Sequence, residues 1–413
     1  MDSTAELDVL KVGQPAGTCA RSGSESRFVG SGGCHCRSAV DYSVVRRAVT
    51  PECCHKAYCR ESLIVKKRDT LGDCSTTNTA LQLTMTDTDT TGPRESEYRG
   101  IQVEPLPIGD AAALSEAVTE NVARVIVGND EVIEAVFSAI LARGHVLLED
   151  VPGVGKTMLA RALATSVDCE FNRVQFTPDL LPSDITGVNV FNQKTREFEF
   201  NHGPVFANLV LGDEINRAPP KTQSALLEAM EESQVTVDGV TRMLPQPFTV
   251  IATQNAIEPD RTYELPFAEL DRFMMKLSLG YPDTETEAEL LDRTVEHHPI
   301  DDLDPVADIE TLQRARETVA GITVREPVRT YAAKLAAYTR KTAEIGVSPR
   351  ATISLVRAAQ ANALVDEREY VVPDDIKHVA HAVLAHRIEP GLADADADGS
   401  AIVTEAVANV PVE

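Results

Sequence analysis

The sequence predicts an α/β domain, in which helices cover both faces of a parallel β-sheet, followed by a smaller all-α domain. Three features support this prediction. An apolar run at 146–148 leads through a glycine-rich loop into a helical pattern. Two later apolar runs, within 209–214 and 248–255, end in polar residues, as strands of α/β sheets do at the edge where ligands bind. Beyond Pro282 only helical periods follow.

The remaining elements follow from hydrophobic period and turn residues. Apolar positions three and four apart predict helices at 108–122, 131–141, 158–164, 222–232, 284–296, 307–319, 327–344, 350–366 and 374–387. Alternation predicts a strand at 171–176. Two β-hairpins are expected, one pairing 188–191 with 197–200 and one over 234–244 that turns at Asp238-Gly239.

The loop between the first strand and its helix has the composition of a phosphate-binding site. It consists of Asp150, Val151, Pro152, Gly153, Val154, Gly155, Lys156 and Thr157. In this context backbone N–H groups and the positive end of the helix dipole face an anion. Lys156 is expected to reach the β- and γ-phosphates of a nucleotide, and the Thr157 hydroxyl to bind Mg²⁺. Asp150 replaces the usual first glycine, at a position that shapes the start of the turn and where Asp tolerates unusual backbone angles.

Acidic and amide side chains end the next two buried strands. Asp213 suits an Mg²⁺ ligand that acts through water, and Glu214 suits a base that orients and deprotonates the attacking water. Asn255 could bond the γ-phosphate or that water, or it could simply start a turn. Upstream of the loop, Gly128 and the apolar residues 125–127 could line an adenine pocket or belong to the core.

The first 84 residues differ in character from the rest. They carry 11 basic residues (Lys and Arg) and 9 acidic residues (Asp and Glu), whereas residues 85–413 carry 28 basic and 55 acidic residues. They also hold seven of the eight cysteines. One interpretation is a zinc site built from Cys34, His35, Cys36, Cys53, Cys54, His55 and Cys59, although these spacings fit no common zinc knuckle. A flexible extension is a second interpretation. We favour a third, in which the natural product starts at Met85.

Composition also bears on partners and location. The chain has 39 basic and 64 acidic residues and a net charge of −25, which disfavours binding to nucleic acid or anionic lipid. No apolar run of about 18 residues occurs, so membrane insertion is not expected. The N-terminus lacks the basic and then apolar build of a signal peptide. We therefore expect a soluble, cytoplasmic protein.

Several stretches together resemble the MoxR-type ATPases of the AAA+ superfamily. They are LLEDVPGVGKT, LVLGDEINRAPPKTQSALLEAMEE, VIATQN, ELPFAELDRF and VSPRA, all within residues 114–390. The resemblance implies an AAA+ P-loop NTPase core and a C-terminal helical lid. It does not extend to residues 1–84, which the family lacks. The expected core spans residues 108–282, and the expected lid spans residues 283–390. Before the core we expect two segments: 1–84, which is disordered or outside the natural product, and 85–107, which is flexible and acidic. After the lid we expect a frayed acidic tail at 391–413.

The resemblance also implies roles for particular residues. Asp213 and Glu214 are similar to the Walker B pair, and Asn255 to sensor 1. Arg350 is similar to the sensor 2 arginine, which reaches from the lid to the nucleotide. Arg272 resembles the arginine finger, which acts on ATP bound by the neighbouring subunit and so implies a homo-oligomeric ring, usually a hexamer. The cofactors implied are ATP and Mg²⁺.

The function implied is ATP-driven, chaperone-like remodelling or maturation of a client protein, often one with a von Willebrand factor A domain. The two hairpins resemble the helix-2 insert and the pre-sensor-1 hairpin, which face the centre of the ring. The alternatives are the ATPase subunit of a metal chelatase, a nucleic-acid motor, and a scaffold that binds nucleotide without turnover. Only Lys194, Arg196 and Arg242 are basic in the hairpins, which counts against the motor. Glu214 counts against the scaffold, because a protein that binds nucleotide without turnover needs no base at this position.

Overall fold

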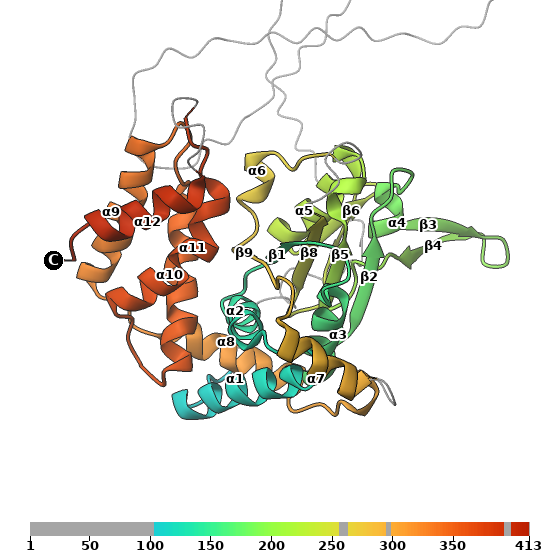
Figure 1. Cartoon of the computed structure of the whole chain (residues 1–413). Coiled ribbons are helices and arrows are strands. Elements are labelled where there is room, and N and C mark those ends of the chain that lie inside the picture. The colour runs from blue at the N-terminus through green and yellow to red at the C-terminus, as the bar shows by residue number, and fades with distance from the viewer. Residues whose placement is uncertain (1–102, 256–262, 295–298, 392–397, 413) are drawn as a thin grey trace, which may run out of the picture. The chain divides into compact units, whose positions relative to one another are not determined.

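The computed structural model describes residues 103–255, 263–294, 299–391 and 398–412 (Figure 1). The predictions for residues 1–84, including the zinc site and the start at Met85, lie outside these ranges. So do most of the 85–107 segment and the end of the helix expected at 284–296. Where this segment is described, its backbone contacts helix α8 (Ile309–Gly321): the Glu104 and Leu106 carbonyls accept hydrogen bonds from Arg314 and Thr318.

Five parallel strands form the central sheet. They are β1 (Val146–Asp150), β2 (Phe171–Gln175), β5 (Leu209–Asp213), β8 (Thr249–Asn255) and β9 (Met275–Leu277). Their order is β2-β5-β8-β1-β9, and every neighbouring pair is parallel. Parallel neighbours need crossover connections, and helices supply most of these. The strand predicted at 171–176 and the three predicted apolar strands are all present.

Helices cover both faces of this sheet, because successive residues of a strand point to opposite sides. Val146 and Leu148 of β1 belong to one apolar core, and Leu147 between them belongs to another. The helices around the sheet include α1 (Ile108–Ala123), α2 (Asp130–Leu141) and α3 (Lys156–Ser166) on the first core, and α4 (Pro182–Thr186) and α5 (Pro220–Glu232) on the second. Burial on both faces explains the continuous apolar runs in the sequence. The predicted α/β fold class is confirmed.

Both predicted hairpins are present as separate two-stranded sheets. The first pairs β3 (Gly187–Asn192) with β4 (Glu197–His202), and the second pairs β6 (Gln234–Val237) with β7 (Val240–Met243). In Figure 1 the β3–β4 hairpin extends away from the central sheet. The hairpins contact each other through Asn189, whose Nδ2 donates to an oxygen of Asp238 at 2.7 Å.

In the described residues, the chain after β9 forms helices and no strand, apart from two isolated β-bridges that pair Thr323 with Tyr370 and Ile345 with Glu389. The helices are α7 (Thr284–Thr294), α8, α9 (Glu326–Thr342), α10 (Pro349–Val365), α11 (Pro373–Leu384) and α12 (Gly399–Asn409), with short 3₁₀ turns at Pro299–Asp302 and Ala385–Arg387. A further short helix, α6 (Phe267–Leu270), precedes β9. The helix α8 contributes Leu312 and Ala315 to the core shared with α1 and α2. The predicted all-α region is confirmed.

The expectation of a frayed acidic end was wrong for residues 399–409. Asp398 caps α12 by accepting a hydrogen bond from the backbone of Ala401 at 2.8 Å. Ile402, Val403 and Ala406 are buried, and α12 packs against α9 and α11. The alternating Asp and Ala residues before the helix are typical of an irregular acidic end, whereas Asp398 is a helix cap and the apolar residues after it have helical spacing.

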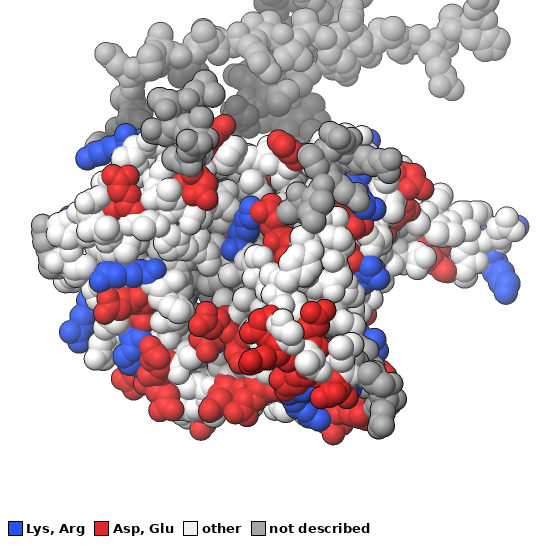
Figure 2. Space-filling view, viewed as in Figure 1, with Lys and Arg blue, Asp and Glu red and all other residues white. Residues whose placement is uncertain are grey.

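Surface charge is unevenly distributed. Figure 2 shows acidic side chains gathered on the lower part of one face, over the region where α1, α7 and α8 lie in Figure 1. The helix α7 alone contains Glu285, Glu287, Glu289 and Asp292. Within the described ranges, no helix combines the length and the apolar character needed to cross a membrane.

The packing of α12 predicts a specific effect on stability. Val403→Asp places a carboxylate at a position that is 1% exposed, so the free energy of unfolding should fall by about 2 kcal/mol or more. Val412→Asp changes a residue that is 45% exposed and serves as the control. Thermal unfolding followed by circular dichroism measures both. Equal melting temperatures for the two variants would contradict the packed position of α12.

Candidate functional site

A cavity of about 310 Å³ lies at the carboxyl ends of β1, β5 and β8. Its lining residues are Pro152, Gly153, Gly155, Lys156, Thr157, Met158, Asp213, Glu214 and Asn255. The parallel register explains the convergence, because Asp150 lies opposite Asn255, and Gly212 lies opposite Ala252. The structure thus brings together the predicted phosphate loop, the acidic pair and Asn255.

The phosphate loop has backbone angles that require glycine. Gly153 and Gly155 have φ of +90° and +98°, in the left-handed region. Gly155 precedes the first turn of α3, whose N–H groups have no partner within the helix and therefore suit an anion. The Lys156 Nζ donates to the carbonyls of Asp150 and Val151 at 2.9 and 3.0 Å. Burial lowers the pKa of Lys156, and the neighbouring carboxylates of Asp150, Asp213 and Glu214 oppose that shift.

Asp150 has a role that its sequence position did not indicate. It is not among the described residues with positive φ, so the expected tolerance of unusual angles does not explain it. Its side chain is buried, and Oδ2 accepts hydrogen bonds from the backbones of Leu279 and Gly280 at 2.6 and 2.9 Å and from the Ser278 hydroxyl at 3.1 Å. Oδ1 accepts from Val151 N at 3.0 Å. Asp150 therefore ties the start of the phosphate loop to the segment that leads from β9 to α7.

A polar network holds the acidic pair. Arg173 donates through Nη2 to Oδ2 of Asp213 at 2.6 Å, and the Thr253 hydroxyl donates to Oδ1 of the same carboxylate at 2.6 Å. The Thr253 oxygen also accepts from Glu214 N at 2.8 Å. The Gln175 side chain donates to Oε2 of Glu214 at 2.7 Å. Glu214 itself has φ of +57°, which turns its side chain out of the line of the strand.

Sequence reasoning missed three of these partners, namely Arg173, Gln175 and Thr253. A signal for two of them exists. Arg173 and Gln175 alternate on β2 and so share one face, and Gln175 lies opposite Asp213 in the parallel register. However, β2 and β5 are neighbours only because of the order of strands in the sheet, and this order cannot be predicted from local sequence patterns.

Asn255 and Gly128 lie in different surroundings. Asn255 is buried at the end of β8 and lines the cavity. Gly128 does not line it; it has φ of +76°, and a Cβ there would lie 2.8 Å from Cγ2 of Thr286 in α7. A Cβ at Gly155 would lie 3.5 Å from Cδ1 of Ile126, so the segment before Gly128 is next to the phosphate loop. The adenine pocket at this segment stays a prediction.

Arg272 and Arg350 are not among the described residues that line the cavity. Arg272 pairs with Glu231 at 3.5 Å and with Glu269 at 3.3 Å. Arg350, at the start of α10, pairs with the same Glu231 at the end of α5. We call these four residues, Glu231, Glu269, Arg272 and Arg350, the arginine patch. Each of the four side chains is 23–45% exposed, so the patch is accessible at the surface.

The residues present suit a magnesium ion bound together with phosphate. Thr157 and Asp213 line the same cavity and offer a hydroxyl and a carboxylate, the hard oxygen ligands that Mg²⁺ prefers. No cluster of three or more His, Cys, Asp and Glu side chains suited to a metal occurs in the described part of the chain. A hydroxyl and a carboxylate are the kind of ligands that bind Mg²⁺ together with the phosphates of a nucleotide.

Comparisons with known proteins agree with this geometry. Residues 145–275 match the ATPase family associated with various cellular activities (AAA), and residues 335–406 match the AAA lid domain. Protein YeaC of Bacillus subtilis is 49% identical over 303 residues, which is 72% of this chain and 94% of YeaC. Chaperone MoxR1 of Mycobacterium tuberculosis is 42% identical, covering 67% of this chain and 75% of its own length. A crystal structure of a proposed ATPase from Cytophaga hutchinsonii has a TM-score of 0.70 and 38% identity, covering 74% of this chain and 97% of that one.

The contacts of Asp150 predict that replacing it with glycine lowers the free energy of unfolding. Asp150→Gly leaves the N–H groups of Leu279 and Gly280 without an acceptor, so unfolding should require about 2 kcal/mol less free energy. Asp168→Gly is the matched control, since Asp168 is exposed and has φ of +43°, which glycine adopts freely. Denaturant unfolding measures both. An Asp150→Gly variant as stable as the control would show that this carboxylate has no structural role.

Proposed function

The chain belongs to the MoxR-type AAA+ ATPases, and we propose that it hydrolyses ATP as a ring of identical subunits in order to remodel a client protein. The observation that carries the proposal is the meeting of a phosphate loop, Asp213, Glu214 and Asn255 in one cavity. A nucleotide-binding scaffold would need the loop but not a carboxylate such as Glu214 beside it.

The polar side chains that line the cavity have distinct tasks in hydrolysis. The loop amides and Lys156 bind the β- and γ-phosphates and stabilise charge that develops during transfer. Glu214 accepts the proton of the attacking water, and Asn255 orients that water or the γ-phosphate. Thr157 and Asp213 would hold Mg²⁺, which neutralises phosphate charge when it is bound. Gln175 and Thr253 hold the side chain and the backbone of Glu214 in place.

We infer that a cation from a second subunit completes the site. Cleavage of the terminal phosphate builds negative charge, which arginine fingers neutralise in related chemistry. Within the described residues Arg272 and Arg350 lie in the arginine patch and not in their own cavity. Both reach Glu231, so both present cations from one accessible region. We assign Arg272, as a finger, and Arg350, as a second cation, to the nucleotide of the neighbouring subunit in a hexameric ring.

The two hairpins supply a surface for the client. Val190, Phe191 and Phe198 of the first are 51, 49 and 71% exposed, and Val240 of the second is 52% exposed. Exposed apolar groups on projecting strands suit contact with another polypeptide. The client that we propose contains a von Willebrand factor A domain, which rests on the family resemblance. A metal-chelatase complex would differ in the partner subunits and not in this cavity.

The hairpins do not favour a nucleic-acid motor. Arg242 packs over the ring of Phe200 at 3.8 Å and donates to the Asn189 side chain, so its guanidinium is already engaged. The acidic surface around α7 and the net charge of −25 oppose binding to a polyanion. Turnover that rises on addition of DNA or RNA would favour the motor.

Two substitutions separate binding from hydrolysis. Lys156→Ala removes the cation that contacts the phosphates and should abolish ATP binding. Glu214→Gln keeps the size of the side chain but removes the base, so binding should persist while turnover falls by about 10² or more. Equilibrium binding of a fluorescent ATP analogue and phosphate release measure the two properties. Equal turnover by Glu214→Gln and the unchanged protein would remove Glu214 from the mechanism.

The assignment of the finger to a neighbour predicts complementation. Arg272→Ala should bind ATP and lose turnover by about 10³ or more. Mixing it with Glu214→Gln subunits should restore part of the activity, because an intact cavity then meets an intact finger. Arg143→Ala, which breaks a surface ion pair with Glu317, is the control and should retain turnover. Mixed rings that assemble but show no recovery would contradict the action of Arg272 in a neighbour.

A further inference from the structure

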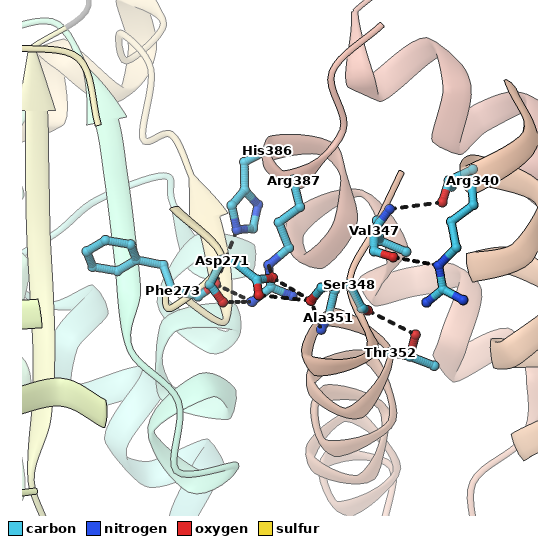
Figure 3. Close-up of polar contacts among 10 residues, drawn as sticks. Asp271, Phe273, Arg340, Val347, Ser348, Ala351, Thr352, His386 and Arg387 are labelled. Carbon is cyan, nitrogen blue, oxygen red and sulfur yellow. Dashed lines mark hydrogen bonds and ion pairs between the residues drawn. The ribbon is translucent and has the colours of Figure 1, made fainter. Parts of the chain in front are cut away.

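The backbone on both sides of Arg272 is held by one buried arginine of the lid. Arg387, in the 3₁₀ turn Ala385–Arg387 after α11, donates through Nη2 to the carbonyls of Asp271 and Phe273 at 3.0 and 2.6 Å. Its Nε lies 3.3 Å from Oδ1 of Asp271. Figure 3 shows Arg387 and His386 reaching this segment from the lid. Arg387 thus binds the residue before and the residue after the proposed finger.

A second lid element holds the same segment. Ser348 is the N-cap of α10, where its Oγ accepts a hydrogen bond from Ala351 N at 3.1 Å. The same hydroxyl lies 2.9 and 2.8 Å from the two carboxylate oxygens of Asp271 and donates to that group (Figure 3). The start of α10 is therefore joined to the residue next to Arg272.

Two of the lid side chains that hold this segment, Arg387 and His386, are buried. The Arg387 side chain is 2% exposed and that of Asp271 is 20% exposed. Burial lowers the pKa of His386 to about 3, so its ring is neutral and Nε2–H donates to the Phe273 carbonyl at 3.2 Å. Hydrogen bonds to a charged, desolvated guanidinium are stronger than neutral ones. The backbone on both sides of Arg272 is therefore held by buried lid side chains, whereas the Arg272 side chain itself pairs with Glu231 and Glu269.

We propose that Arg387 and Ser348 are positioning residues that fix the arginine finger to the lid, so that the lid sets where Arg272 is presented to the neighbouring subunit. The inference rests on the proposed action of Arg272 on a neighbour. Neither residue touches the nucleotide cavity of its own chain. Losing either contact should therefore impair the neighbour's turnover and spare nucleotide binding.

The test compares Arg387→Met with Arg272→Ala in assembled rings of the full chain. Arg387→Met should lower kcat by about tenfold or more while the Kd of a fluorescent ATP analogue changes by less than about threefold. Adding Arg387→Met to Arg272→Ala should lower kcat by less than about twofold further, because a residue that acts through the finger has no effect once the finger is gone. Wild-type kcat in the single variant, or a multiplicative loss in the double variant, would overturn the proposal.

A matched control excludes a general loss of lid stability. Arg368 pairs within the lid with Asp366 and the buried Asp375 and makes no contact with residues 271–273 in the described structure. Arg368→Met should lower the melting temperature and leave kcat within about twofold of the unchanged protein. If Arg368→Met lost as much kcat as Arg387→Met, the effect of Arg387 would be explained by lid stability alone, and the proposal would be overturned.

Mixed rings separate failure of this inference from failure of the finger itself. If Arg272→Ala recovers activity with Glu214→Gln but Arg387→Met does not, the finger acts in a neighbour and Arg387 does not act through it. If neither variant recovers activity, the proposed action of Arg272 on a neighbouring subunit is wrong. Should Arg387→Met not fold, Asp271→Asn takes its place, since it keeps the side-chain size, removes the charge that faces Arg387 and replaces one of the two oxygens that the Ser348 hydroxyl contacts. It should show the same loss of kcat, the same non-additivity with Arg272→Ala and the same recovery.

Discussion

The parallel register of β1, β5 and β8 is the constraint on which the rest of the site depends. Because these strands run in the same direction and end at one edge, the phosphate loop, the acidic pair and Asn255 share a cavity although they are far apart in the sequence. Both faces of the sheet are buried, so a shift by one residue would move every apolar side chain to the wrong core. The chemistry is thus positioned by the same packing that stabilises the domain.

Arg272 and Arg350 are not among the described residues that line the cavity, whereas Arg173 bonds Asp213, which does line it. Arg272 lies between α6 and β9, Arg350 lies in the first turn of α10, and both pair with Glu231 near the end of α5. Bonds from the lid to Asp271 and Phe273 make the finger segment part of the lid's surface. Asp150 joins the phosphate loop to the segment that leads into the lid.

Much of this architecture could be predicted from the sequence, because its signals are local. Alternation and apolar runs located four of the five strands of the central sheet but not β9, and the turn at Asp238-Gly239 located a hairpin. The convergence of Lys156, Asp213 and Asn255 followed from the rule that parallel strands bind ligands at their carboxyl ends. Arg272 and Arg350 have no such local signal. They were identified only by resemblance to a family, and their shared partner Glu231 became visible in the structure.

The features that escaped prediction depend on contacts between distant segments. Gln175 and Arg173 matter because β2 lies beside β5, and Thr253 because β8 lies on the other side. Asp150 looked like a substitute for glycine, whereas its carboxylate is an acceptor for residues 278–280, well over a hundred positions away. The helix α12 follows an acidic run whose last residue, Asp398, is its cap, and its buried face depends on contacts with α9 and α11. Local hydrophobic periodicity does not predict the order of strands in a sheet, nor which distant residues bond to a buried carboxylate.

The central claim, that each site is completed by a neighbouring subunit, is tested most directly by turnover per subunit as a function of protein concentration, with oligomer mass measured on the same samples. We predict that turnover per subunit rises as the chain assembles and levels off when assembly is complete. The Arg272→Ala variant should assemble over the same range and remain inactive. Constant turnover per subunit from dilute monomer to assembled ring would contradict a site shared between subunits.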